Sequence, residues 1–83
     1  MTISDKEINR LEILARQATK AKTKEEKIKL LNLFKEKASK CVVNDPQNEL
    51  YLIESIRHAS EGHSKQTFYY IKKFKKSTSF YNK

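Results

Sequence analysis

The chain has 83 residues, with 18 lysines and arginines against 10 aspartates and glutamates, and it contains one glycine, one proline and one cysteine. A domain of this size buries only about 60% of the surface that its unfolded chain exposes, which argues against an enzyme fold with a deep, enclosed pocket. Length and composition therefore favour a single basic binding or regulatory domain, and we expect no enzymatic activity.

The sequence has no sign of a membrane or secretory segment. No apolar run approaches the roughly 18 residues of a membrane span, and residues 1–10 lack the apolar core of a signal peptide. The single Cys41 cannot form a disulfide within the chain, which is typical of a reducing compartment. We therefore expect a cytoplasmic protein without a transmembrane segment.

The first predicted helix begins at a capping box. Ser4 and Glu7 have the spacing at which the hydroxyl accepts a hydrogen bond from the third helical amide and the carboxylate reaches back. The helix is predicted to run to about Lys22. Its apolar face repeats every three to four residues and comprises Ile8, Leu11, Leu14, Ala15 and Ala18.

Thr23 and Glu26 repeat this box, so a tight connection should place the second helix, predicted over about 24–43, antiparallel to the first. Leu30 and Leu33 lie beside the core stripe of this helix and predict a homodimer interface. The stripe itself comprises Ile28, Leu31, Phe34, Ala38, Cys41 and Val42.

The third helix is predicted over about 47–61. Asp45 suits its N-cap and Pro46 its first turn, while Gly62 suits the left-handed residue that ends a helix. Two apolar rows run along it, one formed by Leu50, Ile53 and Arg57 and the other by Leu52, Ile56 and Ala59.

Ser64 is expected to cap a fourth helix that runs to about Lys76. Its inward side is predicted to be Phe68, Ile71 and Phe74. Residues 1–76 then form one helical domain and residues 77–83 a flexible C-terminal tail. With no strand pattern competing, the fold class is all-α, a compact bundle of four short helices whose last two form a helix-turn-helix-like unit.

Charge and aromatic rings concentrate in the last quarter of the chain. Residues 1–43 hold 11 basic and 6 acidic side chains, whereas residues 44–63 hold one basic and four acidic ones. Residues 64–83 hold six lysines, no acidic residue and six of the eight aromatic residues. This distribution predicts that the C-terminal helix meets a polyanion.

A short helix, the turn Gly62-His63-Ser64 and a second short helix with a cationic surface have the layout of a helix-turn-helix DNA reader. The run from Gly62 to Tyr70, read as Gly-His-Ser-Lys-Gln-Thr-Phe-Tyr-Tyr, resembles the recognition segment of tetracycline-repressor-type regulators. That family commonly has Gly-Val-Ser-Lys, a variable residue, Thr, an apolar residue and Tyr. The likeness covers about nine residues, and the ligand-binding domain of such regulators is missing.

The resemblance implies a turn at Gly62, groove contacts from Lys65 and Gln66, and phosphate contacts from Thr67 and Tyr69. We accordingly expect a small regulator of phage or plasmid type, or a DNA-processing accessory factor, that binds nucleic acid, most readily duplex DNA. The expected contact residues are Ser64, Lys65, Gln66, Thr67, Tyr69, Tyr70, Lys72, Lys73 and Lys76.

Two other functions fit the same residues. The basic aromatic helix and the tail could meet an acidic protein partner or a membrane surface, as in a phage-encoded inhibitor or a bacteriocin immunity protein, a class of small basic helical bundles that this chain resembles. Structured RNA is a third target, and Phe80 and Tyr81 could stack on the bases of a single strand.

Metal and catalytic sites are not expected. Histidines five residues apart across a helix end, as His58 and His63 are, should not converge as residues four apart do, and no cysteine pair accompanies them. One glycine cannot build a phosphate loop, and nothing brings Cys41 to a histidine as a nucleophile would require. The sequence therefore predicts no metal, no cofactor and no catalytic residue.

Overall fold

The computed structural model describes residues 5–41, 43 and 45–81, with the backbone alone over 79–81. Within that part of the chain there are four helices and no strand, which confirms the expected all-α bundle. The helices are α1 (Asp5–Thr19), α2 (Lys24–Ser39), α3 (Pro46–Ser60) and α4 (Ser64–Tyr81).

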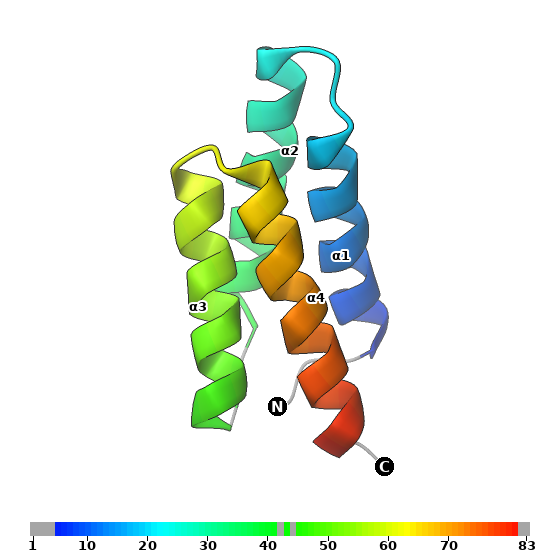
Figure 1. Cartoon of the computed structure of the whole chain (residues 1–83), viewed down its shortest axis with the longest axis vertical. Helices are drawn as coiled ribbons and strands as arrows, with labels where there is room; N and C mark the ends of the chain where they lie inside the picture. Colours follow the sequence, from blue (N-terminus) through cyan, green and yellow to red (C-terminus); the bar gives the residue numbers. More distant parts are fainter. Residues whose placement is uncertain (1–4, 42, 44, 82–83) are drawn as a thin grey trace.

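The four helices close into a ring around one core. Figure 1 shows consecutive helices running in opposite directions along a body that measures 39 × 19 × 18 Å. Each helix packs on the next, and α4 packs back on α1. Short connections and alternating directions are the features of an up-down-up-down four-helix bundle.

Two of the predicted caps are confirmed. The Thr23 hydroxyl accepts a hydrogen bond of 3.1 Å from the amide of Glu26 at the start of α2. At the start of α3 the Asp45 carboxylate accepts one of 3.0 Å from the amide of Gln47, next to Pro46 in the first turn. These bonds satisfy amides that a helix N-terminus leaves without a partner. Ser4, the predicted cap of the first helix, lies outside the described residues.

The first two helices end earlier than the sequence predicts. α1 ends at Thr19 and not at Lys22, and α2 ends at Ser39 and not at residue 43. The caps that follow explain this, because Thr23 and Asp45 both have extended backbones and the residues before them must leave the helix to make the connection. Val42, assigned to the core stripe, lies outside the described residues.

The fourth helix is longer than predicted. It reaches Tyr81 and does not stop at Lys76, because Ser77 bonds to another helix and Thr78 is buried against the bundle. Thr78 is buried and its hydroxyl donates to the Phe74 carbonyl at 2.7 Å, while the Ser77 hydroxyl donates to the side chain of Asn48 on α3. The predicted tail over 77–83 is therefore helical through residue 81, and residues 82–83 lie outside the described part.

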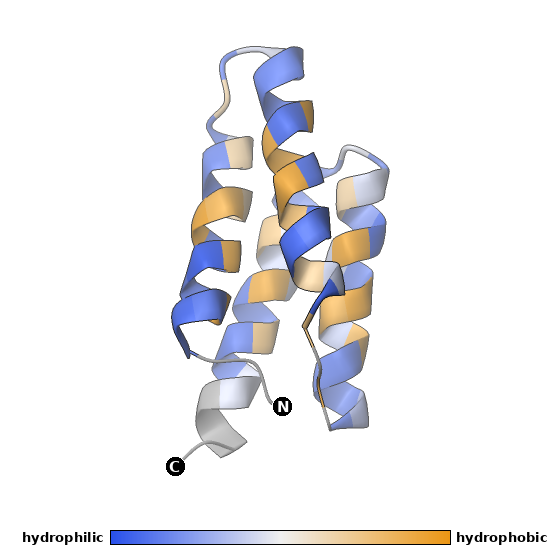
Figure 2. Cartoon of the chain, turned by 180° about the vertical axis from the view of Figure 1, so that it is seen from behind, coloured by the Kyte–Doolittle hydropathy of each residue, from blue (hydrophilic) through white to orange (hydrophobic). Residues whose placement is uncertain are grey.

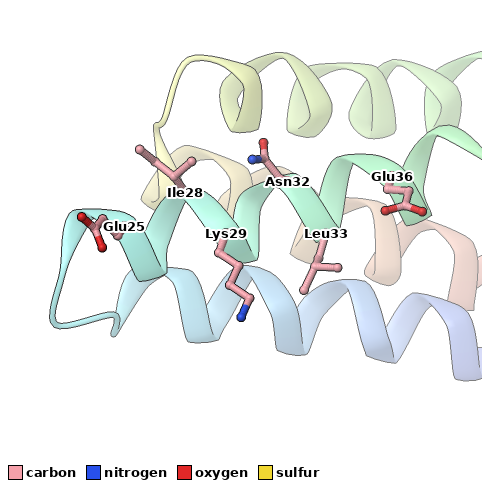
Figure 3. A pocket seen from close by; sticks show the side chains of 6 residues that line it. All are labelled: Glu25, Ile28, Lys29, Asn32, Leu33 and Glu36. Carbon is pink, nitrogen blue, oxygen red and sulfur yellow. The ribbon is translucent and has the colours of Figure 1, made fainter.

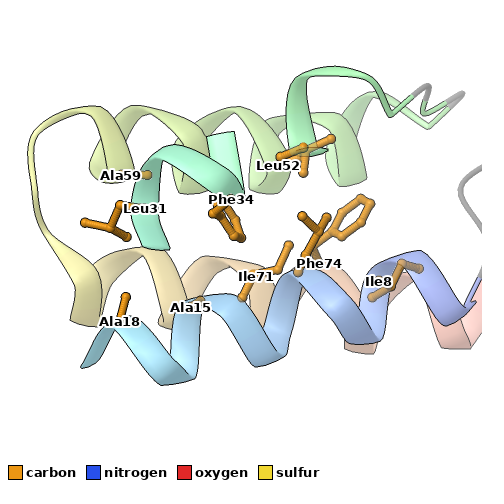
Figure 4. Packing of buried hydrophobic residues seen from close by; sticks show 11 residues of the cluster. Ile8, Ala15, Ala18, Leu31, Phe34, Leu52, Ala59, Ile71 and Phe74 are labelled. Atoms are coloured by element: carbon orange, nitrogen blue, oxygen red, sulfur yellow. The ribbon is translucent and has the colours of Figure 1, made fainter. Parts of the chain in front are cut away.

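Apolar side chains from all four helices meet in the centre of the bundle (Figure 4), and Figure 2 shows hydrophobic and hydrophilic segments alternating along each helix. The buried apolar residues are Ile8, Leu11, Ala15, Ala18, Leu31, Phe34, Ala38, Leu52, Ala59, Ile71 and Phe74. Most were assigned to the core from their spacing. None of the helices in the described ranges is long and apolar enough for a membrane span.

Three apolar residues lie on the surface: Ile28, which the sequence placed on the stripe of the second helix, and Leu50 and Ile53, which form one of the two apolar rows of the third. These three side chains are exposed because other residues of the same helices face the core. The buried residues are Leu31, Phe34 and Ala38 on α2, and Asn48, Leu52, Ser55 and Ala59 on α3. On α3 that inward row includes polar Asn48 and Ser55, which spacing of apolar residues alone does not mark. Cys41 is half-buried against the core, and burial, with a smaller contribution from Glu7, raises the pKa of its thiol.

Candidate functional site

The turn between α3 and α4 is built around the single glycine. Gly62 has a φ of +79°, a left-handed conformation that glycine adopts at little cost. The His63 amide donates to the His58 carbonyl at 2.8 Å, and the Gly62 amide donates to the Ala59 carbonyl at 3.1 Å. These two bonds are those of a Schellman motif, so the predicted role of Gly62 is confirmed.

The fourth helix begins one residue earlier than its predicted cap implies. Ser64 is already the first helical residue, and it is buried. The carbonyl of His63 accepts a 3.0 Å hydrogen bond from the amide of Thr67, so His63, and not Ser64, is the N-cap residue of α4. Ser64 is therefore inside the helix, and its side chain is not displayed at the surface for a phosphate or a base.

The two helices do not cross as those of a helix-turn-helix reader do. In that motif the helices lie at about 90–120° to each other, so that the second one projects into a groove. Here α3 and α4 run side by side in opposite directions (Figure 1), and they make the most extensive contact of any helix pair in the bundle. The side of α4 is accessible, whereas the start of α4 is held against α3.

The accessible side of α4 forms a shallow groove with a volume of about 380 Å³. The residues that line it are Lys65, Phe68, Tyr69, Lys72, Lys73 and Lys76. We call this surface the lysine face. Two of its ammonium groups lie over its own aromatic rings, Lys72 at 5.2 Å from the centre of Phe68 and Lys73 at 5.1 Å from the centre of Tyr69. Tyr69 remains 53% exposed.

The lysine face is strongly cationic, because no acidic side chain of the described residues lines it. A hydrogen bond with Tyr69 raises the pKa of Lys73 above its ordinary value. The neighbouring Lys75 points elsewhere and pairs with Glu12 of α1 at 3.3 Å. A groove lined by charges of one sign concentrates electrostatic potential. The lysine face can therefore attract an anion.

Five of the nine predicted contact residues line the face: Lys65, Tyr69, Lys72, Lys73 and Lys76. Gln66 is exposed but outside the groove, and Tyr70 is half-buried with its ring stacked on His58 at 5.4 Å. Ser64 and Thr67 are buried, and the Thr67 hydroxyl donates to the His63 carbonyl at 2.8 Å. The predicted phosphate contact of Thr67 is therefore wrong.

Phe68 belongs to the face although its spacing indicated only a core position. It is half-buried, packing against the core while part of its ring lines the groove. The Phe68 ring lies beneath Lys72 because of how α4 is rotated about its own axis. The spacing of apolar residues predicts this rotation only roughly. Phe80 and Tyr81, which sequence analysis offered for stacking on bases, have side chains outside the described part.

The predicted dimer patch is not a single surface. Leu33 is 38% exposed and lies with Ile28, 44% exposed, in a groove on the outer side of α2 (Figure 3). Leu30 is half-buried and lines a different groove with Ile13 of α1. Because the two leucines face separate grooves, they do not form the shared two-fold patch that their sequence positions indicated.

The two histidines of the chain converge, contrary to the sequence prediction. The Nδ1 atoms of His58 and His63 lie 3.4 Å apart, and their ring centres are 5.6 Å apart. The reason is the left-handed Gly62, which folds His63 back over the end of α3. Spacing along a regular helix cannot anticipate this contact, although the predicted Schellman turn contained the signal for it.

Comparison with protein-family models, with curated proteins and with solved structures gives no match for this chain. The site must therefore be interpreted from its own geometry.

Proposed function

We propose that this protein binds nucleic acid, with the side of α4 lying along the phosphate backbone of duplex DNA. The observation that carries the proposal is the lysine face, where four ammonium groups and two aromatic rings share one groove with no acidic lining residue among those described. Lysine contacts of this kind neutralise phosphates and release condensed counterions. Such contacts position a protein on the duplex and do not by themselves specify a sequence.

This mode of binding differs from the groove insertion that the tetracycline-repressor-type likeness implies. Ser64 and Thr67 are buried, so the first turn of α4 has only the exposed Lys65 and Gln66 to offer to bases. Lys65, Lys72 and Lys76 follow one another at seven and four residues along an exposed side of the helix, a spacing that suits a run of backbone contacts. A role in regulation or DNA processing would rest on this binding.

The salt dependence of binding tests the proposal. If all four lysines neutralise phosphates, the logarithm of the binding constant for a short labelled duplex should fall with the logarithm of salt concentration at a slope of about −3.6. Changing both Lys72 and Lys73 to Gln should reduce the slope to about −1.8 and weaken binding at every salt concentration. Fluorescence anisotropy measures both quantities.

The matched control removes the same charge elsewhere. Changing both Lys24 and Lys37 to Gln removes two exposed lysine charges of α2 that do not line the groove, and the slope should remain close to that of the unchanged protein. Equal slopes for the Lys72/Lys73 variant and this control would contradict the proposal. Single-stranded DNA, with a slope of about −0.7 per neutralised phosphate, and an RNA hairpin complete the comparison.

An acidic protein surface is the second candidate for the same face. The half-exposed Tyr69, which shares the groove with four lysines, favours it, since aromatic anchors within a polar rim are typical of protein interfaces. Failure to bind duplex DNA, single-stranded DNA and RNA at low salt would exclude the nucleic-acid function and favour this one.

A further inference from the structure

We propose that His58, Glu61 and His63 form a binding site for a divalent transition metal of the zinc class. The site lies at the end of α3 and in the turn before α4, beside the lysine face and separate from it. It requires no property of the proposed nucleic-acid function, because none of its residues lines the groove on α4.

The distance between the imidazoles fits a metal well. Their Nδ1 atoms are 3.4 Å apart, and a tetrahedral site with metal–nitrogen bonds of about 2.0–2.1 Å places two nitrogen ligands about 3.3–3.4 Å apart. The same distance is at the long end for a hydrogen bond. A hydrogen bond would also require one ring to donate and the other to accept, whereas a metal accepts a lone pair from both.

A carboxylate completes the ligand set. One ligand atom from each of His58, Glu61 and His63 lies within 4.8 Å of the others, so a small side-chain movement brings all three to one ion. Two imidazoles and one carboxylate are a donor set that zinc accepts, with water in a fourth position. Magnesium and calcium prefer oxygen ligands and should bind poorly here.

The surroundings of His58 hold its ring in the required orientation. Its side chain is only 15% exposed, and its ring is stacked on Tyr70 with an interplanar angle of 7°. While Nδ1 faces His63, Nε2 lies 3.9 Å from the carboxylate of Glu54. This separation is longer than a hydrogen bond, so Glu54 acts on the ring through its charge; a carboxylate that bonds the far nitrogen of a ligating histidine fixes the ring and raises its basicity.

Arg57 links the two carboxylates of this cluster. Its guanidinium donates to Glu54 at 2.6 Å and to Glu61 at 3.3 Å. The arginine thus keeps Glu61 near the histidines and Glu54 behind them, which reduces the movement that metal binding would demand.

Zinc titration of the whole protein tests the site. Isothermal titration calorimetry should give one zinc ion per chain, and zinc should raise the melting temperature until a chelator is added. Because the chain has only two histidines, proton NMR should show both imidazole signals shifting together during the titration. Magnesium should produce neither effect.

Variants identify the ligands. His63→Ala changes an exposed side chain and should preserve the fold while weakening zinc binding at least about tenfold, as should Glu61→Gln. Glu49→Gln on the same helix and Cys41→Ser should bind zinc like the unchanged protein. Undiminished binding by His63→Ala, loss of binding by Cys41→Ser, one zinc ion per two chains, or no binding by the unchanged protein would each overturn the proposal.

Discussion

At the scale of single residues, Gly62 determines the geometry of the turn between α3 and α4. Its φ of +79° ends α3, starts α4 and brings the two histidines together. A β-carbon placed on Gly62 would meet no atom within 4 Å. The need for glycine at this position therefore comes from the backbone conformation alone and not from any lack of space.

Gly62→Ala should lower the free energy of unfolding by about 1–2 kcal/mol, because a left-handed backbone places the β-carbon close to the carbonyl oxygen. Gly62→Asn should lower it less, since asparagine tolerates this conformation better. Urea denaturation followed by circular dichroism measures both values. If the alanine variant were as stable as the unchanged protein, the turn would have to adopt another conformation.

At the scale of the element, α4 has two sides with different chemistry. Ile71 and Phe74 are fully buried between the other helices, whereas the lysine face looks outward. Thr67 lies on the buried side, where its methyl group packs and its hydroxyl is satisfied within the helix. Its part in the structure is thus to fill space at the contact of α4 with the bundle.

Thr67→Val keeps the branched shape and removes the hydroxyl that donates to the His63 carbonyl. We expect the free energy of unfolding to fall by about 1 kcal/mol, the net worth of a typical hydrogen bond. Affinity for duplex DNA should not change, because Thr67 is buried. Thermal denaturation and anisotropy measure the two properties. Weaker DNA binding at unchanged stability would restore the phosphate contact that the sequence likeness implied.

The sequence predicted the helix ends that depend on local residues and the lysines of α4. It did not predict which side chains of α4 and of the preceding turn are buried or brought together by packing. Local chemistry fixed the caps at Thr23 and Asp45 and the turn at Gly62, since each depends on residues within one turn of helix. The lysines of the face were found from the concentration of charge in the last quarter of the chain and, for Lys65, from the family resemblance. Thr67 and the meeting of the histidines were missed, because both depend on how α4 and the turn pack in three dimensions.

At the scale of the whole molecule, stability rests on a small core shared by four helices. Phe34 from α2 and Phe74 from α4 are the largest fully buried side chains, and Figure 4 shows them among residues of the other helices. Every helix contacts two others. Truncating a central side chain should therefore lower the free energy of unfolding of the whole bundle, which unfolds cooperatively, and not only that of one pair of helices.

Phe34→Ala should lower the free energy of unfolding by about 3–5 kcal/mol, through lost burial and the cavity left behind. For a domain of this length the total is about 4–12 kcal/mol, so a large part of it would be lost. Ile53→Ala, at an exposed position on α3, should change it by no more than about 0.5 kcal/mol. Comparable losses in the two variants would place the core elsewhere.

The closure of the ring by α1 and α4 matters for synthesis on the ribosome. Contacts between consecutive helices form as soon as both have emerged, but the partner of α1 on its second side is the last helix to appear. Until then the apolar stripe of α1 stays partly uncovered, a condition that invites aggregation or chaperone binding. The helix that carries the cationic surface is thus also the last of the four described helices to be synthesised and the one that closes the bundle.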